Sequence, residues 1–111
     1  MKKKFAALVL ALALVLSLAA CGESGGKTIA GTGTIDKDGK VGRIGGIELK
    51  MLGSKRDGAT WFLAPASNCS DVAGRVPDGL RDVKVATLDE AYQALVAIGK
   101  GQADDLPHCE A

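Results

Sequence analysis

The 111-residue sequence is poor in the side chains that build metal and cofactor sites, with one histidine and three cysteines. The best remaining metal-ligand set is Cys69, His108 and Cys109, and two of its three members are adjacent, so we rank it far below a disulfide between the two cysteines. The phosphate-binding pattern G-x-x-x-x-G-K-[ST] is also missing, which excludes ATP-driven unfolding by this chain. We therefore expect no metal, no cofactor and no ATP.

A surplus of positive charge is missing as well. The whole sequence has 14 Lys and Arg against 13 Asp and Glu, and three of the lysines stand at positions 2–4. From residue 21 onward, 11 basic residues face 13 acidic ones, which gives a net side-chain charge of about −2. No basic field is present to attract a nucleic acid, so we expect no nucleic-acid partner.

An apolar run, FAALVLALALVLSLAA, occupies residues 5–20 directly behind the three lysines. The run is shorter than the roughly 20 residues that a transmembrane helix needs. A basic start, an apolar stretch and small residues before a cleavage site are typical of a secretory signal peptide, here over residues 1–20. A short membrane anchor or a buried helix is the alternative.

The end of this run, Leu18-Ala19-Ala20-Cys21, fits the box at which bacterial lipoproteins are processed. Cys21 is then the lipid-attachment residue, and its two or three acyl chains suffice for stable anchoring. Residues 21–27 follow as the lipidated cysteine and a polar, Gly-rich, flexible tether. The sequence thus predicts a cell-envelope protein, lipid-anchored on the extracytoplasmic side of the membrane.

With Cys21 acylated, Cys69 and Cys109 remain. Two cysteines in an exported chain predict one disulfide. It would join the C-terminal tail, residues 105–111, to the loop after a core strand. The chain segment closed between the two cysteines is long enough for the disulfide to stabilise the folded state by roughly 3–4 kcal/mol.

Turn signals and apolar patterns predict four strands, at residues 28–35, 41–46, 60–64 and 83–86. An Asp-Gly pair at 38–39 favours a hairpin between the first two. The sharper alternative for the D-x-D-G sequence is an EF-hand loop. It fails because Lys40, Val41 and Ile47 stand where a ligand, a glycine and a glutamate belong.

Two helices are predicted, at residues 47–56 and from Leu88 to near Gly99. The second starts with a capping box formed by Thr87 and Glu90. Its predicted apolar face comprises Leu88, Ala91, Tyr92, Leu95 and Ile98. The element order predicts an α+β fold over residues 28–104, a small mixed β-sheet with two main helices packed on one face.

Lys50 is the residue that the helical pattern singles out, because it shares a stripe with Ile47, Met51 and Ser54. A lysine there either snorkels to solvent or is a buried amine. A buried amine loses its charge more readily, and a neutral amine can serve as a general base for a serine hydroxyl.

The stretch TIAGTGTIDKDGKVGRIGGIELKMLGSKRDGATWFLAPASN contains G-G-x-x-x-K at 45–50, followed by a segment ending in P-x-x-N at Asn68. It resembles the C-terminal half of the proteolytic domain of Lon proteases, in the version that bacterial membrane-anchored proteins join to a PDZ domain. The later VPDGLRDVKVATLDEAYQAL resembles the closing strand and helix of this domain. Arg43 departs from the family, in which a proline usually stands before I-G-G.

The resemblance implies a partial Lon-type fold and a Ser–Lys dyad, in which a lysine deprotonates the serine that attacks the peptide bond. The lysine falls on Lys50, and the threonine that orients it falls on Thr32. The family's serine lies in a G-P-S-A-G motif, which this sequence lacks. Ser24 fits G-x-S-x-G but lacks the preceding strand and following helix of a nucleophile elbow. Ser54 could hydrogen-bond the Lys50 amine, but it leaves the same helix, a poor geometry for attack.

The sequence therefore predicts an envelope lipoprotein that carries a truncated Lon-type serine endopeptidase domain, non-catalytic alone. The alternative is a fragment or split subunit of an active Lon-type endopeptidase, with the serine supplied by another segment, so the enzyme question stays open. Loss of the missing segment should expose apolar surface, which favours a protein or peptide partner or self-association.

Overall fold

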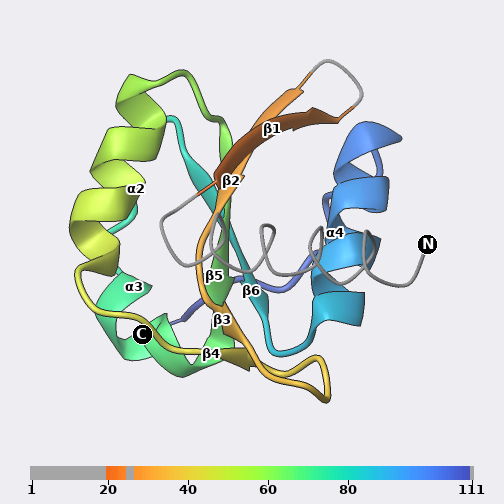
Figure 1. The fold of residues 1–111 in the computed structure, drawn as a ribbon. Helices are drawn as coiled ribbons and strands as arrows, with labels where there is room; N and C mark the ends of the chain where they lie inside the picture. The colour runs from red at the N-terminus through yellow and green to blue at the C-terminus, as the bar shows by residue number, and fades with distance from the viewer. Residues whose placement is uncertain (1–19, 25–26, 111) are drawn as a thin grey trace.

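The computed structural model describes residues 20–24 and 27–110, so the predicted signal peptide over residues 1–20 lies almost wholly outside the described residues. A four-stranded sheet forms the centre of the molecule (Figure 1). Its strands, in spatial order, are β1 (Ala20–Ser24), β2 (Lys27–Gly31), β5 (Trp61–Pro65) and β6 (Arg81–Val85). β1 is antiparallel to β2, whereas β2, β5 and β6 are mutually parallel, which makes the sheet mixed, as the sequence predicted.

The remaining elements surround this sheet. They are the hairpin strands β3 (Thr34–Ile35) and β4 (Val41–Gly42), the helices α2 (Ile47–Arg56), α3 (Cys69–Val72) and α4 (Leu88–Gly99), and the 3₁₀ turn η1 (Ala66–Asn68). The predicted helices at 47–56 and 88–99 are confirmed. The strand predicted at 28–35 is divided in two, because Thr32 and Gly33 lie outside strand structure and Gly33 has a positive φ of 153°. Among the described residues, no helix has both the length and the apolar character to span a bilayer.

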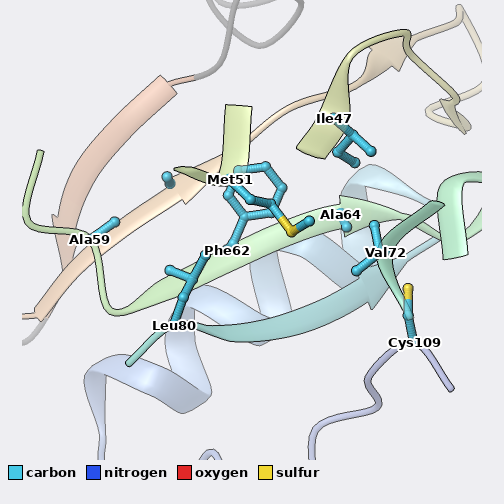
Figure 2. Packing of buried hydrophobic residues seen from close by; sticks show 9 residues of the cluster. Ile47, Met51, Ala59, Phe62, Ala64, Val72, Leu80 and Cys109 are labelled. Atoms are coloured by element: carbon cyan, nitrogen blue, oxygen red, sulfur yellow. The ribbon is translucent and has the colours of Figure 1, made fainter. Parts of the chain in front are cut away.

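The two main helices pack on opposite faces of the sheet (Figure 1). Every residue of β5 is buried. Phe62 packs with Met51 of α2 on one face (Figure 2), and Leu63 packs with Ile98 of α4 on the other. The prediction that both helices share one face is wrong. The physical reason is that a parallel strand flanked by parallel neighbours needs cover on both sides, which the continuous apolar run of β5 reflects.

The predicted flexible tether is also wrong for residues 21–24. They belong to β1, which pairs with β2 over its whole length, from Ala20 opposite Gly31 to Ser24 opposite Lys27. Without β1, the backbone N–H and C=O groups along the outer edge of β2 would lack strand partners. The segment ACGES has no β-branched residue, which is why its composition did not indicate a strand.

The hairpin between β3 and β4 is confirmed, and it packs against the start of α4. Asp36 closes the turn, because its carboxylate accepts hydrogen bonds from the backbone N–H groups of Asp38 and Lys40, both at 2.9 Å. The Gly39 carbonyl then accepts the Leu88 N–H at 2.7 Å. The hairpin therefore satisfies one of the free N–H groups of the first turn of α4.

The capping box of α4 is formed in a modified way. Thr87 Oγ1 accepts the Glu90 N–H at 3.1 Å, as predicted. The Glu90 carboxylate accepts the N–H of Ala86, at 2.7 Å. At the C-terminal end of the helix, Lys27 Nζ donates to the Ile98 carbonyl at 3.1 Å. The helix dipole favours a positive charge at this end.

The C-terminal tail is clipped to the domain by the Cys69–Cys109 disulfide, as predicted. The Cys109 N–H also donates to Asp82 Oδ2 at 2.7 Å, and the Pro107 carbonyl accepts the Lys84 N–H at 3.0 Å. The tail thus runs beside β6. Because both cysteines are oxidised, they are not available as thiolate ligands for the metal site that the sequence left as an alternative.

Candidate functional site

Lys50 is the fourth residue of α2 and is half-buried. The helix starts after Gly46, whose φ of 68° is in the left-handed region, and the Gly46 carbonyl accepts the Lys50 N–H at 3.2 Å. Ile47, Met51 and Ser54 are the buried residues of this helix. The predicted stripe is therefore confirmed for these three. Lys50 stands at its border, and intermediate burial fits a snorkelling lysine better than a fully buried amine.

Thr32 lies directly after β2 and is buried, with 5% of its surface exposed. Its N–H donates to the Leu63 carbonyl at 3.3 Å, which continues the pairing of β2 with β5 by one more residue. The next residue, Gly33, has a φ of 153°, and a Cβ at this position would lie 2.9 Å from Val41 Cγ1. The backbone around Thr32 is therefore held between β5 and the hairpin.

Neither Ser54 nor Ser24 is placed as a nucleophile. The Ser54 hydroxyl donates to the backbone carbonyl of Lys50 at 2.7 Å, so its proton is engaged by the helix backbone. The backbone of Ser24 ends β1, and the chain continues into β2 from Lys27. A nucleophile elbow needs a helix after the serine, and here a strand follows.

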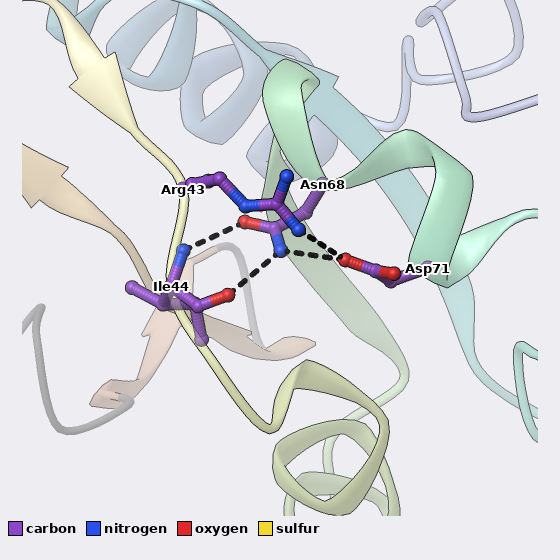
Figure 3. Close-up of polar contacts among 4 residues, drawn as sticks. All are labelled: Arg43, Ile44, Asn68 and Asp71. Atoms are coloured by element: carbon purple, nitrogen blue, oxygen red, sulfur yellow. Dashed lines mark hydrogen bonds and ion pairs between the residues drawn. The ribbon is translucent and has the colours of Figure 1, made fainter.

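Asn68 links the loop after β5 to the segment that leads into α2 (Figure 3). Its side chain is fully buried. Its Oδ1 accepts the Ile44 N–H at 2.9 Å, and its Nδ2 donates to the Ile44 carbonyl at 2.9 Å. Ile44 lies three residues before Ile47, the first residue of α2. This contact, which we call the Asn68 latch, therefore fixes the entry of the helix that carries Lys50.

An ion pair extends the Asn68 latch to the surface (Figure 3). Arg43 Nη2 lies 2.9 Å from Asp71 Oδ2, and the same carboxylate oxygen accepts a hydrogen bond from Asn68 Nδ2 at 3.3 Å. Sequence reasoning noted Asn68 in its motif and Arg43 as a departure from the family, but assigned neither a structural role. Their partners are 24 and 28 residues away in sequence, so no local pattern could have paired them.

A groove of about 590 Å³ lies beside Thr32, between the sheet and α4. It is lined by Gly31, Thr32, Gly33, Leu63, Leu88 and Tyr92, among others. Leu88 and Tyr92 are 46% and 61% exposed, so the prediction that they belong to the buried face of α4 is wrong. Only Ala94 and Ile98 of this helix are buried, because the sheet contacts the helix there and the groove opens toward the helix start.

Sequence comparison identifies the relatives of this fold. The family model of the Lon protease (S16) C-terminal proteolytic domain matches residues 5–98. The chain belongs to the Lon protease family. Lon protease 1 of Bacillus subtilis is 34% identical over 91 residues, which cover 79% of this chain and 12% of that protein. The mitochondrial Lon protease homologs of Eremothecium gossypii and Saccharomyces cerevisiae are 38% and 35% identical over 71 residues, which cover 61% of this chain and 7% and 6% of those proteins.

This chain therefore spans only a small part of its Lon relatives, and both Thr32 and Lys50 fall within the matched range. The match also starts at residue 5, inside the apolar run that the sequence predicted to be a signal peptide. Processing at Cys21 and its lipidation stay predictions, because the Cys21 side chain lies outside the described part of the structure.

Proposed function

We propose that this chain forms the lysine-bearing part of a Lon-type Ser–Lys peptidase domain. In this role Lys50 is the general base, and Thr32 orients it. The observation that supports the proposal is the position of Lys50 in a Lon-family chain. It is half-buried, on a helix whose entry is fixed by the Asn68 latch. A base held on a rigid element is what proton transfer from a nucleophile requires.

The chemistry follows from the dyad. A neutral lysine amine takes the serine hydroxyl proton, the serine oxygen attacks the scissile carbonyl, and an acyl-enzyme forms as the leaving amine is protonated. The sequence has no G-P-S-A-G motif, and the Ser54 hydroxyl is bonded to a backbone carbonyl. The 111 residues are then not catalytic alone, and the serine comes from another segment.

A serine-directed fluorophosphonate probe tests this division of roles. The purified chain should not label, and Ser24→Ala and Ser54→Ala should change nothing. Co-expression with a G-P-S-A-G segment from a Lon-type relative should restore labelling. Lys50→Met should abolish the restored labelling, while Lys55→Met, at an exposed position of the same helix, should leave it unchanged. Labelling of the chain alone, or restored labelling that survives Lys50→Met, would contradict the proposal.

Thr32 has its own test in the same assay. Thr32→Val should weaken the restored labelling, because the variant keeps the shape of the side chain and removes its hydroxyl. Thr32→Ser restores a hydroxyl and should recover most of the labelling. Equal labelling in both variants would mean that Thr32 does not orient Lys50.

The Leu18–Cys21 box favours a second candidate, a non-catalytic envelope lipoprotein that is anchored through Cys21 on the extracytoplasmic side of the membrane. Metabolic labelling with an alkyne fatty acid in a bacterial host, followed by intact mass measurement, tests it. Incorporation that is lost in Cys21→Ala, together with removal of residues 1–20, would establish this candidate. An unmodified full-length chain would eliminate it.

Exposed leucines on α2 support an interaction with a protein or peptide partner, or self-association. Leu49 and Leu52 are 74% and 53% exposed and lie three residues apart on one helix. Apolar pairs of this kind favour association when they face water together. Sedimentation velocity should show a concentration-dependent dimer that Leu49→Lys disrupts, and a strict monomer at all concentrations would argue against self-association.

A further inference from the structure

β6 is the last strand of the sheet in the described part of the chain, so its outer edge faces no further described strand (Figure 1). On the inner side, the Arg81 N–H donates to the Thr60 carbonyl at 3.0 Å. Successive residues of a strand direct their backbone groups to opposite sides. Asp82 and Lys84 therefore direct their N–H and C=O groups to the outer edge. Such an edge can pair with another chain unless something covers it.

The C-terminal tail covers this edge without forming a strand. The Pro107 carbonyl accepts the Lys84 N–H at 3.0 Å, and the Cys109 N–H donates to Asp82 Oδ2 at 2.7 Å. Because proline has no N–H, Pro107 cannot return a hydrogen bond to the Lys84 carbonyl. The disulfide from Cys109 to Cys69 fixes the end of the tail. The tail thus shields β6 but does not supply the reciprocal hydrogen bonds of a neighbouring strand.

The packing of the tail is loose. A cavity of about 440 Å³ is lined by Leu106 and His108 of the tail and by residues 76–82, among others. Among the described residues of the tail, only Cys109 is buried and only Leu106 is half-buried. A segment that buries so little apolar surface can leave its place at low cost once its disulfide constraint is relaxed. The tail is therefore a removable cover for the edge of β6.

The sequence of β6 is complementary to itself at this edge. In an antiparallel pair of two β6 strands centred on Val83, Asp82 of each copy lies opposite Lys84 of the other. Because both residues direct their backbone groups outward, each such pair can exchange two backbone hydrogen bonds. The opposite charges of the two side chains favour the same pairing. A second β6 strand therefore replaces the contacts that Lys84 and Asp82 lose when the tail leaves.

We propose that the outer edge of β6 is an interaction surface for a second copy of this chain, and that the C-terminal tail shields it. With the tail in place, the chain does not pair through β6. With the tail released, two copies join their sheets through β6. This surface is distinct from the Leu49 and Leu52 pair on α2, and the inference does not depend on the peptidase role.

Loosening the tail tests the shielding. All proteins are full-length chains that carry Cys21→Ser and Leu49→Lys, which exclude a third thiol and association through α2. One variant replaces residues 105–108 by about eight Gly and Ser residues, which keeps the disulfide and removes the Pro107 contact. A second variant, Cys69→Ala with Cys109→Ala, releases the tail in another way, so the test does not depend on the folding of one variant.

Circular dichroism checks that each variant is folded, and sedimentation velocity measures its association. Both variants should form a concentration-dependent dimer, because the edge of β6 is open in each. The chain with its tail intact should stay monomeric over the same concentrations. A dimer of the chain with the intact tail, or folded variants that stay monomeric, would overturn the proposal.

Charge exchange in the loosened-tail variant identifies the surface. Lys84→Asp places like charges at both cross-strand positions and should weaken the dimer about tenfold, and Asp82→Lys should do the same. A mixture of the two should regain the dimer, because each Asp again lies opposite a Lys. Lys37→Asp, at an exposed position of the hairpin, is the matched control and should change nothing. A dimer that resists Lys84→Asp, or a mixture that stays monomeric, would show that the copies do not meet at β6.

Discussion

Asn68 provides both hydrogen bonds that a neighbouring strand would give to Ile44. The Ile44 N–H donates to Asn68 Oδ1 and Asn68 Nδ2 donates to the Ile44 carbonyl, each at 2.9 Å. An antiparallel strand would satisfy a residue through the same reciprocal pair. One buried side chain therefore satisfies the backbone N–H and C=O groups of Ile44, which lies between the end of β4 and the start of α2.

Asn68→Ala should lower the free energy of unfolding by about 2–4 kcal/mol, because it removes two hydrogen bonds and leaves the Ile44 groups without partners. Urea denaturation followed by circular dichroism measures the change. Arg43→Ala is the control within the same network. The Arg43–Asp71 pair has side chains that are 61% and 40% exposed, so its loss should cost only about 0–1 kcal/mol. Equal losses in the two variants would contradict this account.

Gly33→Ala should destabilise the domain by about 1–3 kcal/mol. Its φ of 153° is unfavourable for a residue with a side chain, and the new Cβ would meet Val41 Cγ1 at 2.9 Å and Pro65 Cγ at 3.3 Å. Gly45→Ala is the matched exchange, since nothing lies within 4 Å of a Cβ at that position. It should be neutral or slightly stabilising, by up to about 1 kcal/mol. Thermal unfolding measures the two variants side by side. A higher midpoint temperature for Gly33→Ala than for Gly45→Ala would refute the prediction.

Thr87→Ala should cost about 1 kcal/mol, because α4 loses the hydroxyl that caps the Glu90 N–H. Thr87→Ser keeps an acceptor at the same place and should retain most of the stability. Hydrogen exchange at the first turn of α4 gives a local measurement that global unfolding does not. Faster exchange at Glu90 in the alanine variant alone is expected. The same rate in both variants would show that the cap contributes nothing.

The Cys69–Cys109 disulfide joins residues that are 40 apart in sequence, so its reduction should lower the free energy of unfolding by roughly 3–4 kcal/mol. The measurement uses the Cys21→Ser background, which removes the third thiol, with and without a phosphine reductant. A further double exchange, Cys69→Ser with Cys109→Ser, should be insensitive to the reductant. Unchanged stability on reduction of the disulfide-bonded protein would show that the tail is held by its other contacts.

Several elements could be predicted because their signals are local. The boundaries of α2 are readable from the spacing of Ile47, Met51 and Ser54, since a period of 3.6 residues brings these positions to one face. Thr87 marks the start of α4 by the chemistry of a cap, and the Asp-Gly pair marks the hairpin. The disulfide followed from cysteine counting. In each case the relevant partners are few or lie within a few residues of one another.

Other features could not be predicted because they depend on how distant segments meet. The composition of residues 20–24 is not that of a strand, and they become one because the edge of β2 offers unpaired backbone groups. Leu88 and Tyr92 share the apolar period of Ile98, yet only Ile98 is buried. The periodicity indicates that a helix has an apolar face. How much of that face is buried depends on how far the sheet extends beneath the helix.

By itself, the sequence determined the two main helices, the hairpin, the disulfide and membership in the Lon family, and it singled out Lys50. Only the tertiary structure decided that the helices lie on opposite faces, that Asn68 holds Ile44, and that an apolar groove opens beside Thr32. The physical reason is that hydrophobic burial has no direction of its own. The apolar side chains of β5 require cover on both faces, and the chain's path through space decides which segment supplies it.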